Sequence, residues 1–296
     1  MASPARSTLI VNPSATEVTM DRVDRITDVL PGRVDVRLTE RRGHATELAR
    51  EAVAADVDAI YVFSGDGGFN EVLNGVDGDI PLGFVPGGGT SVLPRALGLP
   101  RTPVAAAEQL ARGQSRRISL GRVNGRRFGF NAGVGFDAEL VRRVDGLGRK
   151  PDGRRPGDVA FAWIAVRTIV DHRASWDTRL ELEGFGRAAF VLFANCDPYT
   201  YAGARPLHVA PEARFELGID FVAPIRVRPT TVPSFLLRLL RGSTSAAAGD
   251  VLVGHDLDRV VVWCDSPLPL HVDGEDLGDV QEAVFESQRD AVTVLV

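Results

Sequence analysis

Two hydrophobic periodicities alternate along residues 1–120 of the chain. Short apolar runs predict buried strands, and apolar residues that recur every three or four positions predict helices. The predicted strands are Ser7–Asn12, Val34–Leu38, Ala59–Phe63 and Pro81–Val85. The predicted helices are Met20–Leu30, His44–Val53, one that starts with Phe69–Leu73, and Thr102–Arg112. Strands that alternate with helices predict an α/β fold with a parallel sheet covered on both faces.

Strand patterns dominate after this point, and they predict a β-rich antiparallel sandwich. Asn124-Gly125 is a strong signal for a two-residue hairpin. The predicted strands are Arg116–Val123, Arg126–Phe130, Thr178–Leu182, Ala188–Ala194, Ile219–Val222, Arg259–Cys264, Ala283–Ser287 and Ala291–Val296. Two helices are predicted, at Asp158–His172 and Val232–Arg241, and the polar, glycine-rich segment Arg142–Asp158 is predicted to be a mobile loop.

Composition narrows the class of protein. The chain is 44% hydrophobic and 25% charged, as soluble globular proteins are. A net charge of −5 argues against a nucleic-acid partner, and no apolar run is long enough to span a bilayer, so we expect a cytoplasmic protein. Lys150 is the only lysine, which argues against a Walker-type phosphate loop, a protein-kinase site and a pyridoxal site.

Two glycine-rich segments carry candidate phosphate chemistry. Ser64–Gly68 and Pro86–Ser91 each follow a predicted buried strand and precede a helix. Glycine lets the backbone approach phosphate oxygens closely, and a helix N-terminus favours negative charge. Asp66 fits such a place if a divalent cation bridges it to phosphate. Each turn alone could be a tight strand–helix connection with an aspartate cap, but two turns on consecutive strands predict a cradle for a triphosphate.

A third segment, His271–Asp276, places acids around a glycine between strand-like runs. Such a turn can present a carboxylate to a site. It is equally typical of an exposed hairpin, in which Asp-Gly is common.

Taken together, the ordered motifs of the chain resemble those of the diacylglycerol kinase catalytic family, which includes bacterial lipid kinases, sphingosine kinases and ceramide kinases. The resemblance covers nearly the whole chain. It rests on Val11–Thr16 (VNPSAT), Ser64–Gly75 (SGDGGFNEVLNG), Pro86–Pro100 (PGGGTSVLPRALGLP), Asn131–Glu139 (NAGVGFDAE) and Val272–Glu275 (VDGE), with Gly43–Ala49 (GHATELA) typical of an actinobacterial branch.

The resemblance implies a fold and a reaction. The first domain, residues 1–120, resembles NAD kinase and phosphofructokinase, and the second, residues 121–287, is a β-rich acceptor domain. In the family the nucleotide lies between the domains, and the end of the chain, here 288–296, can rejoin the first. The implied reaction is transfer of the γ-phosphate of ATP, with Mg²⁺, to the hydroxyl of diacylglycerol or a related lipid alcohol.

The resemblance also implies roles for individual residues. The nucleotide-binding positions are Asn12, Thr39, Gly65, Asp66, Gly67, Gly89, Thr90, Arg95, Arg142, Arg143 and Glu275. The acceptor-binding acids are Asp137 and Glu139, and the metal ligands are Asp66 and Glu275, with Glu216 and Asp220 at a structural metal. Asp273 is the general base by analogy with bacterial members, whereas sphingosine kinases point to Asp66.

The chain departs from the family pattern at three places. Ser64 and Gly68 replace the first glycine and the threonine of the common GGDGT form. Ser91 replaces an asparagine, and no basic residue follows Asn12-Pro13. These departures keep two alternatives open, a sphingosine- or ceramide-type activity and a non-catalytic nucleotide or lipid sensor. NAD kinase, which shares the GDG motif, is a third.

A lipid acceptor requires contact with a membrane. The apolar segment Val232–Leu240, with Arg238 and Arg241, fits an interfacial helix or an ordinary core helix. The basic segment from Arg149 to Arg155 fits a contact with anionic lipid or a solvated loop. We therefore expect peripheral membrane association. Members of the family often form homodimers, although nothing in the chain marks an interface.

Overall fold

The chain divides into two compact units. The computed structural model describes residues 6–146, 167–168, 171, 176–243 and 249–296. Unit 1 comprises Met1–Ile118 and Asp290–Val296, and unit 2 comprises Ser119–Arg289. The division predicted from sequence lies within two residues of these bounds at either end. Strands β5 (Ser115–Val123) and β16 (Glu275–Leu295) each have residues in both units.

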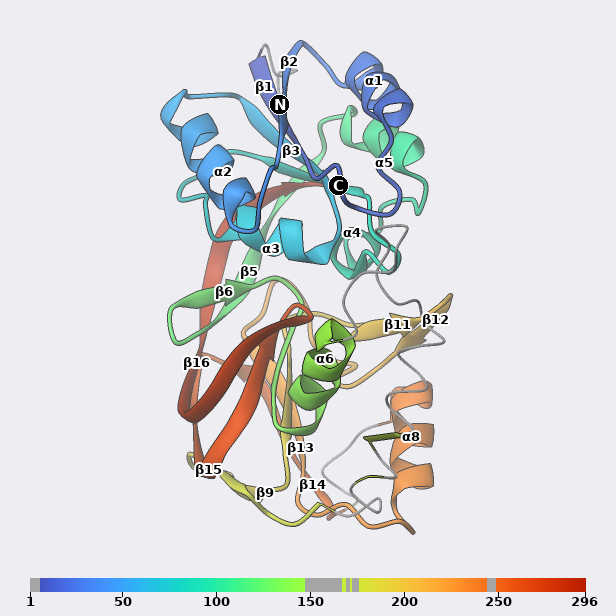
Figure 1. Ribbon diagram of the computed structural model, residues 1–296. Coiled ribbons are helices and arrows are strands. Elements are labelled where there is room, and N and C mark those ends of the chain that lie inside the picture. Colours follow the sequence, from blue (N-terminus) through green and yellow to red (C-terminus); the bar gives the residue numbers. More distant parts are fainter. Residues whose placement is uncertain (1–5, 147–166, 169–170, 172–175, 244–248) are drawn as a thin grey trace. The chain divides into compact units, whose positions relative to one another are not determined.

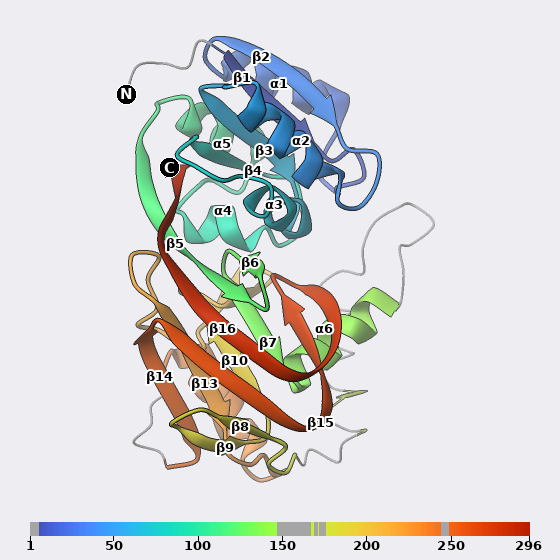
Figure 2. The ribbon, with the colours of Figure 1, turned by 90° about the vertical axis from the view of Figure 1, so that its left-hand side faces the viewer.

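Unit 1 is a parallel sheet with the strand order β4–β3–β1–β2, in which Figure 1 labels β1 to β3 and Figure 2 also labels β4. Its strands are β1 (Arg6–Val11), β2 (Arg33–Leu38), β3 (Ala59–Ser64) and β4 (Leu82–Pro86). The end of β16 pairs with β4 in parallel at Val294 and Leu82. Every residue of β3 is buried because the strand is central and both of its faces are covered.

Five helices of unit 1 lie within the described residues. They are α1 (Met20–Val29), α2 (His44–Ala54), α3 (Asp66–Leu73), α4 (Val92–Ala96) and α5 (Pro103–Leu110). Helix α1 packs against α5 on one side of the sheet, and α2 packs against α3 on the other (Figures 1 and 2). Each apolar helical face, such as Val23 and Ile26 of α1, is buried against the sheet. Burial of one such side chain contributes about 1.5–3 kcal/mol.

Unit 2 is built on antiparallel strands in the order β14–β13–β10–β7–β15–β16. Phe193 and Phe285 stack in its core with ring centroids 3.7 Å apart. Its remaining strands are β6 (Arg126–Phe128), β7 (Asn131–Val134), β8 (Leu180–Leu182), β9 (Gly186–Ala188), β10 (Val191–Ala194), β11 (Thr200–Ala202), β12 (Arg205–Leu207), β13 (Ile219–Pro224), β14 (Val251–Leu257) and β15 (Arg259–Val272). The described helices are α6 (Phe136–Gly146) and α8 (Val232–Arg241).

Several predicted elements of unit 2 need correction. The segment predicted as a loop from Arg142 begins as helix, because α6 continues to Gly146. The two predicted strands at the end of the chain are one strand, β16. Strand β14 was not predicted, since His255 and Asp256 interrupt its apolar pattern. The predicted helix α8 and the Asn124-Gly125 hairpin between β5 and β6 are confirmed. The predicted helix Asp158–His172 and the basic segment Arg149–Arg155 lie outside the described residues, apart from 167, 168 and 171.

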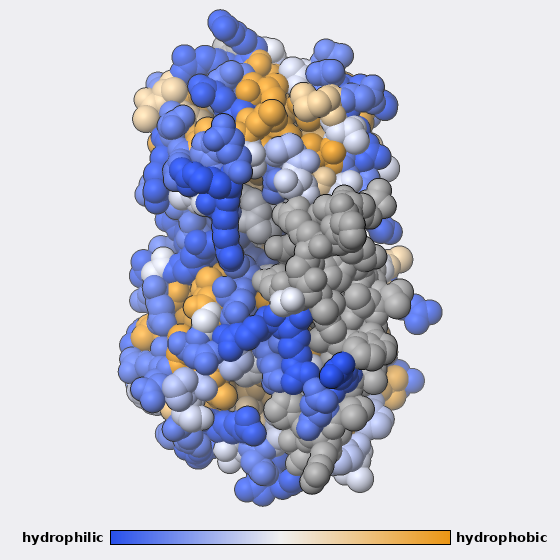
Figure 3. Space-filling model, in the orientation of Figure 1, coloured by the Kyte–Doolittle hydropathy of each residue, from blue (hydrophilic) through white to orange (hydrophobic). Residues whose placement is uncertain are grey.

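Hydrophilic residues cover much of the face of unit 2 shown in Figure 3, with smaller hydrophobic areas between them. Helix α8 packs through Val232, Phe235 and Leu239 against a buried cluster, while Leu237 and Leu240 are exposed. Within the described part of the chain, no helix has the length and apolar character needed to cross a membrane.

Candidate functional site

The carboxyl ends of the parallel strands of unit 1 are joined by backbone hydrogen bonds. Asn12 N donates to Phe63 O (3.0 Å), and Thr39 N donates to Val11 O (2.8 Å). The Asn12 side chain accepts from Ser14 N (3.0 Å) and so shapes the turn after β1. The structure therefore brings the predicted residues Asn12 and Thr39 to the edge of the sheet where open α/β folds bind ligands.

The two glycine turns lie against each other at this edge, as predicted. Ser64 pairs with Pro86 in the parallel register, and Gly87 N donates to Ser64 O (2.7 Å). A Cβ atom on Gly88 would lie 2.9 Å from Gly65 Cα, closer than Cβ atoms approach in proteins. Glycine at position 88 is therefore required by the close approach of the two backbones.

Each turn leads into a helix. Asp66 is the first residue of α3 and accepts a long hydrogen bond from Leu93 N (3.4 Å) at the start of α4. Ser91 adopts a left-handed conformation (φ 48°), and its hydroxyl accepts from Gly88 N and donates to Gly88 O, both at 3.1 Å. The hydroxyl of Ser91, one of the departures from the family pattern, thus serves to close the second turn. Arg95 donates to Thr90 O (3.5 Å) and supports the same turn.

This edge of unit 1 has the chemistry that nucleotide phosphates and Mg²⁺ require. Amide N–H groups at the start of α3, next to glycine residues without side chains, suit phosphate oxygens. The partly exposed carboxylate of Asp66 is the kind of oxygen ligand that Mg²⁺ binds, usually with phosphate oxygens and water completing the shell. The donor set therefore fits both groups.

In unit 2, Asp137 is the centre of a buried polar cluster between α6 and β15. Its Oδ2 accepts from the Tyr199 hydroxyl (2.5 Å) and contacts His271 Nε2 (2.8 Å). No described residue donates to Oδ1, and the side chain of Asp137 is 17% exposed. Burial alone would raise the pKa of Asp137, but the charge of His271 and the hydrogen bonds from His271 and Tyr199 outweigh burial and lower it. Asp137 is therefore a fixed, ionised acceptor with one oxygen available.

Asp273, the predicted general base, is held by backbone amides. Its carboxylate accepts hydrogen bonds from three successive amides, Gly129 N (2.7 Å), Phe130 N (3.0 Å) and Asn131 N (3.1 Å). The residue is 4% exposed and has a positive φ of 47°. Asp273 thus anchors the start of β7, and these hydrogen bonds occupy three of the four lone-pair positions of its carboxylate.

Four more predicted side chains form ion pairs inside unit 2. Glu275, predicted as a metal ligand, is paired with Arg126 (2.8 Å). Arg142 is paired with Asp276 (2.9 Å) and Asp279 (2.7 Å), and Arg143 with Asp171 and the predicted acceptor acid Glu139, both at 2.6 Å. Carboxylates of the same unit thus pair with both guanidinium groups in this structure, and the role of Arg142 and Arg143 toward nucleotide phosphate stays a prediction.

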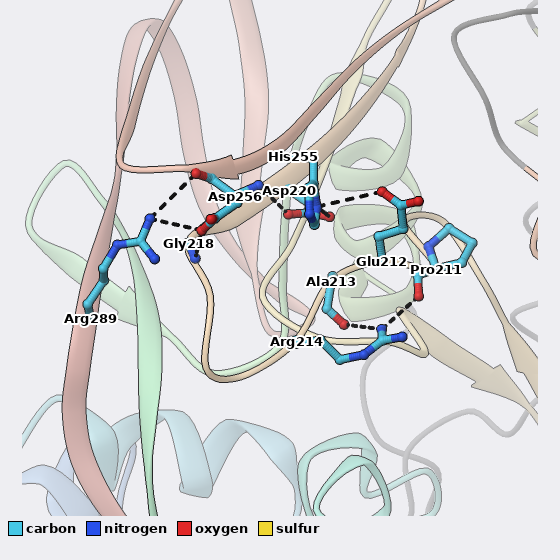
Figure 4. A network of polar contacts seen from close by, with 9 residues as sticks. All are labelled: Pro211, Glu212, Ala213, Arg214, Gly218, Asp220, His255, Asp256 and Arg289. Atoms are coloured by element: carbon cyan, nitrogen blue, oxygen red, sulfur yellow. Dashed lines mark hydrogen bonds and ion pairs between the residues drawn. The ribbon is translucent and has the colours of Figure 1, made fainter.

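The predicted structural metal ligands also have other partners. Asp220 is buried and contacts His255 Nδ1 (2.8 Å) and Asp256 N (2.9 Å), as Figure 4 shows. Glu216 is exposed, and His255 lies 4.0 Å from Glu212 instead. The part of the chain that the structure describes holds no group of three His, Cys, Asp or Glu side chains able to hold a metal ion. In this structure the neighbour of the Asp220 carboxylate is the titratable side chain of His255.

Sequence reasoning missed two residues that organise these sites. Tyr199, next to the Asp137 carboxylate, carried no motif. Glu71 of α3 accepts from Gly43 N (2.8 Å) and Ala45 N (3.1 Å) at the start of α2. The acidic residue five positions after Asp66 was the available signal, since a carboxylate suits the N-terminus of a neighbouring helix.

Comparison with known sequences supports the predicted family. Residues 6–123 match the family described as the diacylglycerol kinase catalytic domain. A diacylglycerol kinase of Bacillus subtilis is 42% identical over 106 residues, which cover 34% of this chain and 35% of that protein. A diacylglycerol kinase of Staphylococcus haemolyticus is 36% identical over 94 residues, 30% of this chain and 28% of that protein. The chain spans about half the length, or less, of the curated relatives it matches.

Solved structures confirm the predicted fold class. A diacylglycerol kinase from Bacillus anthracis has a TM-score of 0.73 at 18% identity, covering 100% of this chain and 98% of that chain. An NAD kinase from Archaeoglobus fulgidus in complex with ATP has a TM-score of 0.53 at 14% identity, covering 98% of this chain and 93% of that chain. At these identities the likeness shows the fold alone. Residues 6–123 and the ordered motifs that they contain are therefore similar to the diacylglycerol kinase catalytic domain, as the motifs of the sequence predicted.

Proposed function

We propose that the chain is an ATP- and Mg²⁺-dependent lipid kinase that phosphorylates the hydroxyl of diacylglycerol or a related lipid alcohol. The hydroxyl oxygen forms a bond to the γ-phosphorus, the bond from this phosphorus to the β-phosphate oxygen breaks, ADP leaves, and the hydroxyl proton passes to a carboxylate. The observation that carries the proposal is the pair of interlocked glycine turns beside Asp66, in a segment that matches the diacylglycerol kinase catalytic domain.

Each unit binds one of the two substrates in this proposal. In unit 1 the glycine turns hold the nucleotide phosphates, with Gly65, Gly67, Gly89 and Thr90 at the phosphates and Asn12 and Thr39 on neighbouring strand ends. Asp66 holds Mg²⁺, which neutralises phosphate charge during transfer when it is bound. In unit 2 Asp137 accepts a hydrogen bond from the acceptor hydroxyl through Oδ1, since Tyr199 and His271 already fix Oδ2.

In this proposal the hydroxyl proton passes to Asp137, whose Oδ1 already accepts its hydrogen bond, because Asp66 is engaged with Mg²⁺. The oxygens of Asp273 already accept three amide hydrogen bonds, which leave at most one of the four lone-pair positions of the carboxylate for a proton. General-base help contributes about 10²–10⁴-fold, whereas positioning and charge neutralisation supply most of the acceleration in phosphoryl transfer. The choice of base therefore affects the rate without deciding the reaction.

Helix α8 is the element that we propose for the membrane surface. Leu237 and Leu240 are exposed by 44% and 49%, and Arg241 follows them. Arg238 is less available than Arg241 to bind a lipid phosphate, because it pairs with Asp250 (2.6 Å) and lies over the ring of Phe235. An exposed apolar strip beside a cation suits an anionic lipid surface.

The test is to incubate the purified chain with γ-labelled ATP, Mg²⁺ and either mixed lipid vesicles or NAD. We expect label in a lipid phosphate, with diacylglycerol vesicles ahead of sphingosine or ceramide vesicles. Label in NADP instead would assign the chain to the NAD kinases. Binding of ATP without transfer to any acceptor would make it a sensor and overturn the proposal.

A further inference from the structure

Ser64 carries a buried hydroxyl group that does not stabilise the fold through a hydrogen bond within the described residues. It is the last residue of β3 and is 2% exposed. Its Oγ has no hydrogen-bond partner among the residues that the structure describes. Buried polar groups are nearly always paired, because leaving one unpaired is unfavourable. We therefore expect the Ser64 hydroxyl to have a hydrogen-bond partner that is not among the described residues of the free protein.

The position of this hydroxyl is defined by Gly68, in the first turn of α3. A Cβ atom built on Gly68 would overlap Ser64 Oγ and lie 2.7 Å from Ser64 Cβ. Gly67, one residue earlier, has open space around the same point. Glycine at position 68 is therefore required by the serine at 64, and the Oγ points into the turn that begins with Asp66.

The two unusual residues of this turn are thus explained by one contact. A side chain at 68 and a side chain at 64 would compete for the same space, so only one of them can carry the hydroxyl. The departures from the family pattern at positions 64 and 68 are then a single exchange, in which the hydroxyl moves from the helix to the strand. The turn keeps a hydroxyl, although at another position of the chain.

We propose that Ser64 is a positioning residue of the phosphate turn, whose hydroxyl gains its hydrogen-bond partner only when nucleotide phosphate occupies the turn, and that Ser64 and Gly68 form one interdependent pair. The inference rests on the proposed function, because it requires that a nucleotide binds at this turn. It adds a residue from the buried strand to a site otherwise built from backbone amides and Asp66.

The first experiment measures MgATP affinity by calorimetry and thermal unfolding of the free protein for Ser64→Ala. We expect affinity to fall about tenfold, the cost of one hydrogen bond to a charged group. The unfolding temperature of the free protein should stay the same or rise, since the variant removes an unpaired buried hydroxyl. Ser7→Ala in β1 is the matched control, because Ser7 Oγ is equally buried and also lacks a partner among the described residues.

Two results would overturn this part of the inference. One is a Ser64→Ala variant that binds MgATP as tightly as the parent chain. The other is a variant that unfolds at a clearly lower temperature than Ser7→Ala, since the hydroxyl would then have a structural partner in the free protein.

The second experiment tests the exchange. Gly68→Thr alone should lose MgATP affinity by more than about tenfold, because its side chain must displace Ser64 or the turn. The double variant Ser64→Gly, Gly68→Thr should recover affinity to within about threefold of the parent, because the space is vacated and a hydroxyl is restored. Equal binding by the single variant and the parent, or no recovery in the double variant, would refute the pairing.

The failure of this inference can be told apart from that of the proposed function. If the parent binds MgATP but transfers no phosphate to lipid, the kinase proposal fails while the Ser64 experiments still decide the inference. If the parent binds no MgATP, both fail. If Gly68→Thr does not fold, Ser64→Ala decides alone.

Discussion

Two regions of the molecule, the glycine turns of unit 1 and the acid cluster of unit 2 (Asp137 and Asp273 with their partners), are held in place in different ways. The turns are backbone surfaces in which two chains approach so closely that a Cβ on Gly88 would not fit. The acid cluster is made of side chains, with Asp137 held by Tyr199 and His271 and Asp273 held by three amides. The glycine turns depend on the absence of a side chain where the two backbones meet. The acid cluster depends on the hydrogen bonds that its carboxylates accept.

This difference determines how each region responds to change. Added volume at Gly88 disturbs the turns, because its Cβ would meet the backbone of Gly65. Loss of a partner disturbs the acid cluster, because a buried charge or amide is then left unpaired. Substitutions can therefore tell the two regions apart by the kind of damage that they cause.

The largest effect is expected for Asp66→Asn. The variant keeps an oxygen that can accept from Leu93 N, so the turn should fold, but it loses the charge that binds Mg²⁺. Turnover should fall by at least about 10²–10³-fold, as when one group that stabilises the transition state is removed. Initial rates with labelled ATP and lipid vesicles, together with thermal unfolding, measure both quantities. Turnover close to that of the parent would remove Asp66 from the proposed site.

The next largest effect, on stability, is expected for Asp273→Ala. Three buried amides lose their acceptor, and alanine must adopt a positive φ, so the free energy of unfolding should fall by about 3 kcal/mol or more. Asp265→Ala, which removes an exposed ion pair with Arg187, is the control and should change it by less than about 0.5 kcal/mol.

The companion variant Asp273→Asn separates an anchor from a base. Asparagine tolerates the backbone conformation but offers one oxygen in place of two. If Asp273 is an anchor, stability and turnover should fall together in chemical denaturation and rate measurements. A loss of turnover with unchanged stability would restore Asp273 as the base.

The contrast between the regions also explains what the sequence could predict. Buried strands and glycine turns have local signatures, so β1 to β4 and the meeting of Ser64–Gly68 with Pro86–Ser91 were predicted correctly. The partners of Asp137, Asp273 and Arg142 come from strands and helices distant in sequence, such as Tyr199 and the amides before β7. No local pattern records those pairings, so the carboxylates that pair with Arg142 and Arg143 could not be predicted from the sequence.

The coupling of Ser64 and Gly68 is intermediate between local patterns, which the sequence shows, and pairings of distant residues, which it does not. The sequence shows two departures four positions apart, but only the packing of β3 against α3 shows that they occupy one space. Likewise the acidic turn near Asp220 predicted a metal site, whereas its partner His255 lies on β14, which was not predicted because His255 and Asp256 interrupt its apolar pattern.

The smallest expected effect is a pH dependence confined to unit 2. The hydrogen bond with Asp220 raises the pKa of His255, so this pair stabilises the fold fully below about pH 6.5 and loses its contribution as pH rises through the raised value. His255 is 42% exposed, so solvent screening limits the effect to about 1 kcal/mol or less.

The measurement is the free energy of unfolding of the parent and of His255→Gln at pH 6 and pH 8.5. Burial raises the pKa of Asp220, and the hydrogen bond with His255 partly offsets this, so the comparison of the two proteins at both pH values isolates the contribution of the histidine. The decline between the two pH values should be smaller in the variant. An identical decline in both proteins would show that the pair carries no pH-dependent stability.

The division of labour between the regions is tested most directly by measuring KM for ATP and KM for the lipid in Gly88→Ala and Asp137→Asn. Gly88→Ala adds a Cβ where the two turns meet and should raise KM for ATP by about tenfold or more, with KM for the lipid nearly unchanged. Asp137→Asn removes the ionised acceptor and should raise KM for the lipid by a similar factor, with KM for ATP nearly unchanged. Glu183→Gln, which weakens an exposed pair with Arg259, should change neither. Parallel changes of both constants in either variant would contradict the assignment of nucleotide to unit 1 and acceptor to unit 2.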